Sequence, residues 1–177
     1  MVGGVHLRKA VLGDEQALSI VGSATFLETF AGALDGADVV SHCRAQHSPE
    51  IYAGWLADAE WDIWLAETEV GGAPAGYLVL GPAALPGDVR PDDLEIKRIY
   101  VLRPFQGGGA GRELIHAASS RAEARGAKRL MLGVYGKNER AIGFYQRMGF
   151  TVHGTRRFRV GDREYDDLVL QLLLSNA

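Results

Sequence analysis

Cysteine is almost absent from this sequence of 177 residues, which contains only Cys43. A single cysteine forms no internal disulfide and no multi-cysteine metal site, and such cysteine usage is typical of a reducing compartment. The five histidines are scattered, and no pair has the spacing of a zinc motif. We therefore expect no bound metal ion.

Long apolar runs and an excess of basic charge are also missing. No run approaches the roughly 18 residues that span a bilayer, and the first residues lack the features of a signal peptide. We expect a cytoplasmic protein without a membrane partner. The formal net charge of −3 argues against binding nucleic acid through the overall field of the protein. With 47% hydrophobic residues, the chain can bury one core, so residues 1–177 are predicted to form a single domain.

Hydrophobic periodicity predicts strands and helices in the order strand, two helices, two strands, then strand, helix, strand, helix and a final hairpin. Asp14 is expected to cap the first helix. The residue ranges expected to form strands are 5–11, 61–67, 75–81, 94–102, 127–135, 150–160 and 163–174. Helical patterns occupy 13–32, 38–46, 49–59, 109–126 and 138–149, and a loop rich in Pro, Gly and Asp covers 82–93.

Three consecutive glycines, at positions 107 to 109, separate a predicted strand from a predicted helix. The dinucleotide pattern G-x-G-x-x-G fails, because Arg112 or Leu114 stands where its third glycine belongs, and the Walker pattern fails because no Gly-Lys-Ser/Thr follows. Backbone N–H groups of a glycine-rich turn and the positive end of a helix nevertheless make a site for a diphosphate. Arg103 and Arg112 can add charge-assisted contacts to it.

Two motifs resemble those of the GNAT superfamily of N-acetyltransferases. The first, which matches Q/R-x-x-G-x-G/A, consists of Gln106, Gly107, Gly108, Gly109, Ala110 and Gly111. The second, which matches N-x-x-A-x-x-F/L-Y-x-x-x-G-F, consists of Asn138, Ala141, Phe144, Tyr145, Gly149 and Phe150. The resemblance is strongest over residues 94–174. Within the superfamily, "LEIKRIYV", "ATFLETF" and the terminal "FRVGDREYDDL" are most similar to bacterial spermidine/spermine N-acetyltransferases.

This resemblance implies a single GNAT-like domain of the α/β (α+β) class, with a mixed central sheet of about six to seven strands flanked by about four helices. It also implies transfer of an acetyl group from acetyl-CoA to a primary amine by direct attack, and the subgroup resemblance suggests a polyamine as that amine. The pantetheine arm would lie along Ile99, Tyr100 and Val101, where a bulge would free an N–H for the oxyanion. The loop from Gln106 to Arg112 would bind the diphosphate, and Asn138 would line the ligand. Tyr145 is then the general acid for the departing thiolate.

The general base follows less directly from the resemblance, because Lys97 and Gly133 occupy the positions where relatives carry a carboxylate. Glu95, on the same strand face as Lys97, is a candidate base, with a solvated surface role as the alternative. Acidic residues near the expected acceptor side could attract a polycation such as a polyamine, and the alternative is that they only solvate the loops, as loop carboxylates usually do. The carboxylates are Asp88, Asp92, Asp93, Glu95, Asp162, Glu164, Asp166 and Asp167. Protein N-acetylation and an idle CoA-binding module stay open as other functions, in a monomer or a homodimer.

Overall fold

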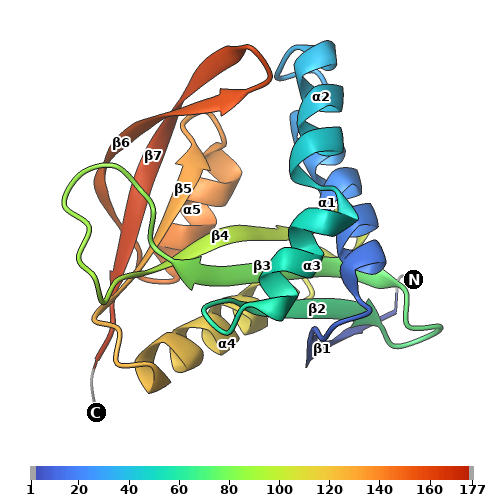
Figure 1. Ribbon diagram of the computed structural model, residues 1–177, viewed down its shortest axis with the longest axis horizontal. Coiled ribbons are helices and arrows are strands. Elements are labelled where there is room, and N and C mark those ends of the chain that lie inside the picture. Colours follow the sequence, from blue (N-terminus) through green and yellow to red (C-terminus); the bar gives the residue numbers. More distant parts are fainter. Residues whose placement is uncertain (1–2, 176–177) are drawn as a thin grey trace.

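The computed structural model describes residues 3–175 and contains one seven-stranded sheet in the order β1-β2-β3-β4-β5-β7-β6 (Figure 1). Only the β4–β5 pair is parallel in the described sheet, and the other neighbours run antiparallel. The strands are β1 (Val5–Lys9), β2 (Asp62–Thr68), β3 (Pro74–Pro82), β4 (Leu94–Val101), β5 (Arg129–Tyr135), β6 (Thr151–Val160) and β7 (Arg163–Leu173). The helices are α1 (Glu15–Phe30), α2 (Gly36–Gln46), α3 (Pro49–Ala57), α4 (Ala110–Ala124) and α5 (Glu139–Arg147).

Helices cover both faces of this sheet. On one face, α1 and α3 pack on β2 and β3, while α2 leans on the β6–β7 hairpin (Figure 1). On the other face, α4 and α5 pack over the centre of the sheet. The buried stripe of α4 is made of small and medium residues, Ala110, Leu114, Ala118 and Ala122. Small side chains at a spacing of four let a helix approach a sheet closely.

The sheet opens between its two parallel strands. Their ladder holds two residue pairs, Leu94 with Leu130 and Glu95 with Met131. Beyond these pairs, β4 continues beside β3 to Val101, whereas β5 continues beside β7 to Tyr135. The facing edges of β4 and β5 are therefore left without a strand partner over their second halves. This opening positions the site described below.

The predicted α/β fold with a mixed sheet is confirmed, and the predicted strands and helices are found within a few residues of their expected bounds. One local prediction is wrong. Asp14 stands at the N-cap position of α1, but its carboxylate makes no cap hydrogen bond. It accepts instead from both Nη atoms of Arg8, at 2.8 Å each, and from the backbone N–H of Val11. A bidentate guanidinium competes successfully with a backbone N–H for the same oxygens. No helix of residues 3–175 is long and apolar enough to cross a membrane.

Candidate active site

A cleft of about 1090 Å³ lies where β4 and β5 separate. We call the part lined by the 106–112 loop and α5 the cofactor half. The part lined by α1, α2 and the β6–β7 hairpin, on the sheet face opposite α4, is the acceptor half. The predicted site residues that line the cleft are Glu95, Ile99, Tyr100, Val101, Gln106, Gly107, Gly108, Gly109, Gly111, Arg112, Asn138 and Tyr145. Ala110 does not line it, because its methyl group belongs to the buried stripe of α4 and faces the core.

The glycine loop has the backbone of an anion site. Gly107 and Gly109 have φ angles of +88° and +97°, a region that side-chain-bearing residues rarely adopt. Gly109 is the N-cap of α4 and has no side chain to occupy the free N–H groups of the first turn. A Cβ at either glycine would enter open space. The amide N–H groups at the start of α4 are thus accessible to a ligand in the cleft.

Two polar side chains around this loop are engaged within the protein. The Gln106 amide donates from Nε2 to the carbonyl oxygen of Val101 at 2.7 Å, so it ties the loop to β4. Arg103 donates through Nη2 to the carbonyl of Glu28 at 3.3 Å. In the described structure, Gln106 and Arg103 therefore hold the loop in place. The backbone N–H groups of the loop face the ligand site. The cationic residues that line the cofactor half are Arg103, Arg112, Lys137, Arg140 and Arg147.

The free edge of β4 presents the main chain of alternate residues. Leu102 N–H donates to Ala75 of β3 at 2.8 Å. Because the backbone groups of an antiparallel strand alternate in direction, those of Tyr100 also point to β3. Those of Ile99 and Val101 point into the opening. The main chain of Ile99 and Val101 can therefore pair with an extended ligand as a further strand would. Tyr100 instead contributes its ring, which stacks on the ring of Tyr77 with 6.2 Å between ring centres.

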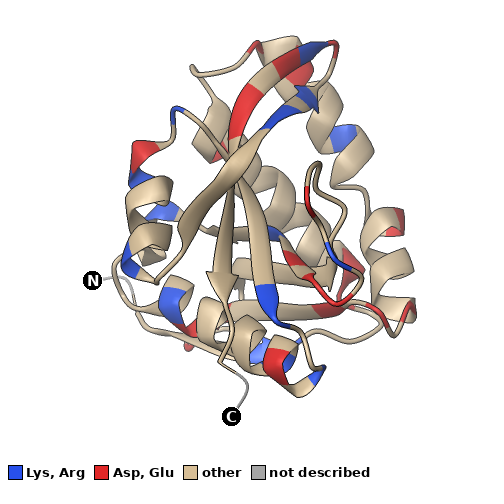
Figure 2. Ribbon diagram, turned by 90° about the vertical axis from the view of Figure 1, so that its left-hand side faces the viewer, with Lys and Arg blue, Asp and Glu red and all other residues tan. Residues whose placement is uncertain are grey.

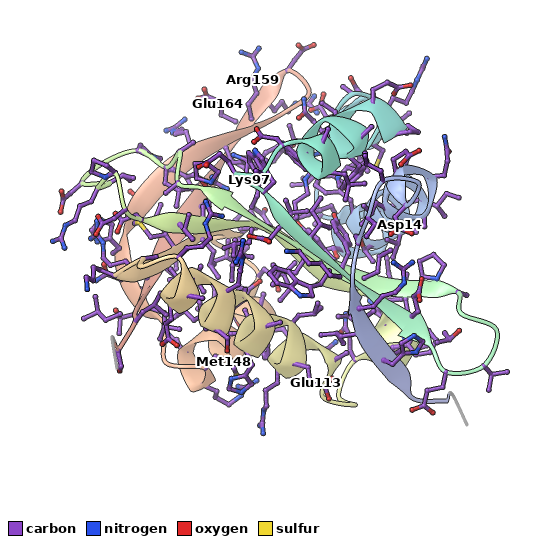
Figure 3. The ribbon with its side chains drawn as sticks, turned by 60° about the horizontal axis from the view of Figure 1, so that its bottom comes forward. Asp14, Lys97, Glu113, Met148, Arg159 and Glu164 are labelled. Atoms are coloured by element: carbon purple, nitrogen blue, oxygen red, sulfur yellow. The ribbon has the colours of Figure 1, made fainter. Side chains whose placement is uncertain are left out.

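The expected bulge in β4 exists, but it lies at Lys97. The register passes from Val79 opposite Arg98 to Leu80 opposite Ile96, which leaves Lys97 unpaired. The bulge therefore precedes the segment of Ile99 to Val101 in which it was expected. Figure 3 shows Lys97 near the middle of the sheet. An extra residue in one strand re-aims the backbone around it, and Lys97 also lines the cleft, so the bulge lies at the wall of the cleft.

Glu95, the base suggested by the sequence, is buried and already engaged. Its side chain is 2% exposed. One carboxylate oxygen accepts from the backbone N–H of Ala84 at 2.9 Å, which holds the loop between β3 and β4. The other lies 3.9 Å from Nζ of Lys97. Lys97 is thus its counter-ion rather than a substitute for it.

The α5 motif supplies a phenol and an amide to the cofactor half. Tyr145 is buried, and its ring packs on Phe150 at 5.8 Å. Burial raises the pKa of Tyr145, with a smaller contribution from Tyr100, so its phenol stays protonated at neutral pH. Asn138 caps α5, because its side-chain oxygen accepts from the N–H of Ala141 at 3.2 Å. Its amide NH₂ group has no hydrogen-bond partner among the described residues and faces the cleft.

Sequence reasoning placed Asp167 only among the acidic residues near the acceptor, but it is a buried carboxylate in the acceptor half. It lies on β7 opposite Arg156 of β6, whose Nε and Nη2 both contact Oδ2 at 3.1 Å. Oδ1 has no hydrogen-bond partner among the described residues. Burial raises the pKa of Asp167, although Arg156 opposes the shift. Gly133 accommodates this pair, since a Cβ there would lie 2.3 Å from the guanidinium of Arg156.

Aromatic rings surround the acceptor half, which the sequence did not indicate because they come from distant elements. Phe26 of α1 stacks on His42 of α2 with 4.3 Å between ring centres, and Phe158 of β6 meets His42 at 5.9 Å. Burial, aided by the charge of Arg98, lowers the pKa of His42 to about 4, so this ring is neutral at pH 7. The remaining aromatic lining residues are Phe30, Tyr100, Tyr135 and Tyr165.

Charges near the acceptor half are mixed rather than uniformly acidic. Figure 2 shows both signs on the β6–β7 hairpin. Asp93, which was expected near the acceptor, is fully buried and accepts from Arg129 at 2.6 and 3.0 Å. Glu164 and Asp166 lie within 4 Å of Arg157. The arginines thus offset most of the acidic field that the sequence suggests. Among residues 3–175, no group of three or more His, Cys, Asp or Glu side chains is arranged to hold a metal ion.

Comparison with known proteins decides the family. Residues 27–150 match the acetyltransferase (GNAT) family. The chain belongs to this family. It is 36% identical over 172 residues to an uncharacterized N-acetyltransferase of Lactobacillus delbrueckii subsp. lactis, covering 97% of this chain and 98% of that protein. It is also 34% identical over 157 residues to an uncharacterized N-acetyltransferase of Mycobacterium tuberculosis, covering 89% and 96% of the two chains.

Solved structures share the fold of this acetyltransferase. The PaiA N-acetyltransferase of Thermoplasma acidophilum, solved in complex with coenzyme A, matches with a TM-score of 0.78 at 18% identity, covering 96% of this chain and 99% of that one. The ribosomal-protein-alanine N-acetyltransferase of Brucella melitensis matches with a TM-score of 0.73 at 25% identity, covering 96% and 99%. The family and the coenzyme A-bound neighbour agree with the expected cosubstrate, acetyl-CoA.

Proposed function

We propose that this enzyme transfers the acetyl group of acetyl-CoA directly to a primary amine. The observation that carries the proposal is the opening between β4 and β5, which places a free strand edge, a helix N-terminus and the phenol of Tyr145 on one cleft. The diphosphate would bind the N–H groups at the start of α4. The pantetheine arm would extend along Ile99 and Val101, and the amide of Asn138 is available to donate to it.

Amine attack needs a proton acceptor, and we propose Asp167 for this role. The amine nitrogen forms a bond to the thioester carbon, and its proton passes to the free Oδ1 of Asp167, directly or through water. A carboxylate whose pKa is raised by burial is a better base at neutral pH than an exposed one. Arg156 holds Oδ2 and so orients the group. Glu95, the base suggested by the sequence, is a second candidate whose oxygens already face Ala84 and Lys97.

Collapse of the tetrahedral intermediate breaks the carbon–sulfur bond. The N–H groups around the Lys97 bulge are suited to stabilise the oxyanion, since backbone donors fixed in place cost little reorganisation. The departing thiolate takes a proton from Tyr145, which water then reprotonates. The raised pKa of Tyr145 ensures that a proton is present for this step at every physiological pH.

The acceptor itself is a separate part of the proposal. A polyamine is the acceptor implied by the resemblance of "LEIKRIYV" and the C-terminal segment, and it stays a prediction. Protein N-acetylation is an alternative supported by the ribosomal-protein-alanine N-acetyltransferase neighbour at 25% identity. The buried ion pair of Asp93 with Arg129 reduces the number of carboxylates available to a polycation.

The test is an acetylation assay with an amine panel that contains spermidine, spermine, amino acids, aminoglycosides and an N-terminal peptide. CoA release and mass spectrometry of the product report transfer. We expect acetyl-CoA binding by calorimetry and acetylation of at least one amine class. Absence of both acetyl-CoA binding and acetylation would contradict the proposed function.

A further inference from the structure

Arg98 is a guanidinium without a carboxylate partner in the acceptor half. Its Nη1 donates to the hydroxyl of Tyr52 at 2.9 Å and lies 3.4 Å from Nδ1 of His47. The group stands over the rings of Tyr52 and Trp55, at 5.4 and 4.8 Å from their centres. Among the residues that the structure describes, no Asp or Glu oxygen lies within 4.0 Å of it. Its Nε and Nη2 atoms make no hydrogen bond to those residues.

The other cations of the acceptor half are paired. Lys97 faces Glu95 at 3.9 Å, and Arg156 contacts Asp167 at 3.1 Å. The charge of Arg98 is therefore left uncompensated in this half of the cleft. This charge also acts on a neighbouring side chain. Burial and then Arg98 lower the pKa of His47 to about 2. His47 is therefore uncharged at neutral pH, so it neither adds a second positive charge beside Arg98 nor neutralises the charge of Arg98.

We propose that Arg98 binds an anionic group of the acceptor, so the amine that this enzyme acetylates also carries a carboxylate. The inference rests on the proposed function and adds the chemical class of the acceptor. A guanidinium fits a carboxylate through two parallel N–H donors. Arg98 lines the cleft, and its Nε and Nη2 have no hydrogen-bond partner among the described residues. A polycation would meet this charge as a repulsion.

The position of Arg98 relative to Asp167 supports recognition of the acceptor at two points. Both charges act on the hydroxyl of Tyr100. Burial raises the pKa of Tyr100 to about 12, while Arg98 lowers it and Asp167 raises it. Geometry points the same way. Arg98 and Tyr100 are two residues apart on β4, so their side chains lie on the same sheet face, where Tyr100 packs beside Phe158. Asp167 lies opposite Arg156, whose guanidinium stands over the Phe158 ring at 4.8 Å from its centre. An ammonium group at Asp167, a carboxylate at Arg98 and an apolar body against the rings would complement this half of the cleft.

The first experiment compares amines that differ only in the carboxylate, using the wild-type enzyme. The pairs are L-phenylalanine with phenethylamine and 6-aminohexanoate with pentylamine. We expect kcat/KM to be about 10- to 100-fold higher for the carboxylate-bearing member of at least one pair, the size of a charged hydrogen bond. Spermidine is assayed beside them. The inference would be overturned if both decarboxylated amines had a kcat/KM equal to or higher than that of their carboxylate-bearing partners. It would also be overturned if spermidine had a higher kcat/KM than every amino acid.

The second experiment removes the guanidinium. Arg98→Met should raise KM for the carboxylate-bearing amine at least 10-fold. The KM for the decarboxylated amine of the same pair and the KM for acetyl-CoA should stay nearly unchanged. Arg98→Lys should restore part of the difference, because it keeps the charge but loses the two-pronged geometry. Arg159→Met is the matched control, since Arg159 lies exposed at the far end of the β6–β7 hairpin (Figure 3). An equal loss with both members of the pair would show that Arg98 only supports the fold around Tyr52.

Failure of this inference differs from failure of the proposed function. Acetylation of decarboxylated amines alone would remove the role of Arg98 and leave acetyl transfer intact. If no amine is acetylated, calorimetry with N-acetyl-phenylalanine and N-acetyl-phenethylamine still measures the preference. Tighter binding of the acid, lost in Arg98→Met, would support the anion site without transfer. Equal binding of the two would contradict it.

Discussion

Replacing Asp167 by Asn separates a catalytic carboxylate from a structural one. The substitution keeps the shape of the side chain and an oxygen for Arg156, but it removes the base. General base catalysis contributes about 10²- to 10⁴-fold, or about 3 to 5 kcal/mol of transition-state free energy. We therefore expect kcat to fall at least 100-fold, with little change in the Kd of acetyl-CoA, because Asp167 lies in the acceptor half.

The pH dependence of this variant follows from the sign of the pKa shift. Burial raises the pKa of Asp167, so the wild-type rate should rise as pH increases through that raised value and the carboxylate forms. Asp167→Asn should lose this acidic limb. A raised carboxyl pKa also means that folding favours the protonated form. The stability from this group is present below the unfolded pKa and is lost as pH rises through the folded pKa. At pH 7 the variant should therefore unfold at or above the wild-type temperature.

The assay is CoA release at saturating acetyl-CoA from pH 5.5 to 9, with thermal unfolding measured in the same buffers. Asp166→Asn is the matched control. Asp166 is the residue next to Asp167 on β7, so its side chain points to the other face of the sheet, and it is 88% exposed. A variant Asp167→Asn with wild-type kcat and an intact acidic limb would refute the role of Asp167. The same measurement on Glu95→Gln would then examine the base that the sequence suggests.

Three further predictions concern the thiolate, the loop and the fold. Tyr145→Phe should lower kcat about 100-fold without changing acetyl-CoA Kd, since only the proton donor is lost. Gly108→Val should weaken acetyl-CoA binding more than 10-fold by calorimetry, because the new side chain would obstruct the diphosphate site. Gly108 is chosen because its φ is not in the left-handed region, so valine adds bulk there without straining the backbone. Asp93→Asn should cost about 3 kcal/mol and lower Tm by roughly 6 to 12 °C, because Arg129 would lose its buried counter-ion and keep only the exposed carboxylate of Asp88 at 3.9 Å.

Each of these predictions has an outcome that contradicts it. A Tyr145→Phe enzyme at wild-type speed would mean that water or another group protonates the thiolate. The loop variant is compared with Gly54→Ala, whose Cβ enters open space at an exposed helix position. Unchanged acetyl-CoA affinity in Gly108→Val would remove the diphosphate assignment.

For Asp93, burial alone would raise the pKa, but hydrogen bonds from Arg129 and the N–H of Arg90 outweigh it and hold the pKa below its usual range. Its stabilisation is therefore present above the unfolded pKa of about 3.9 and disappears as pH falls through the folded value. A wild-type Tm in Asp93→Asn at pH 7 would show that the pair contributes no net stability.

Features that depend on local chemistry could be predicted from the sequence. The glycine loop is one, because a strand, three glycines and an amphipathic helix follow one another in residues 94–124. The left-handed backbone at Gly107 and Gly109 also requires glycine. The order of strands and helices also follows from short-range periodicity. Tyr145 and Asn138 are seven residues apart along α5, so a helix suffices to bring both to one ligand.

Other parts of the site depended on contacts between distant segments. Asp167, Arg156 and Gly133 come from three strands, and only the register of β5, β7 and β6 makes one of eight acidic residues a buried carboxylate with a free oxygen. The aromatic walls and Arg98 likewise combine α1, α2, β4 and β6. Packing on both faces of the sheet sets the bulge at Lys97 and the separation of β4 from β5. Local strand propensity does not encode this packing. Local patterns specify which groups a segment offers, whereas burial and pairing across the fold decide which of those groups stays charged, free and able to react.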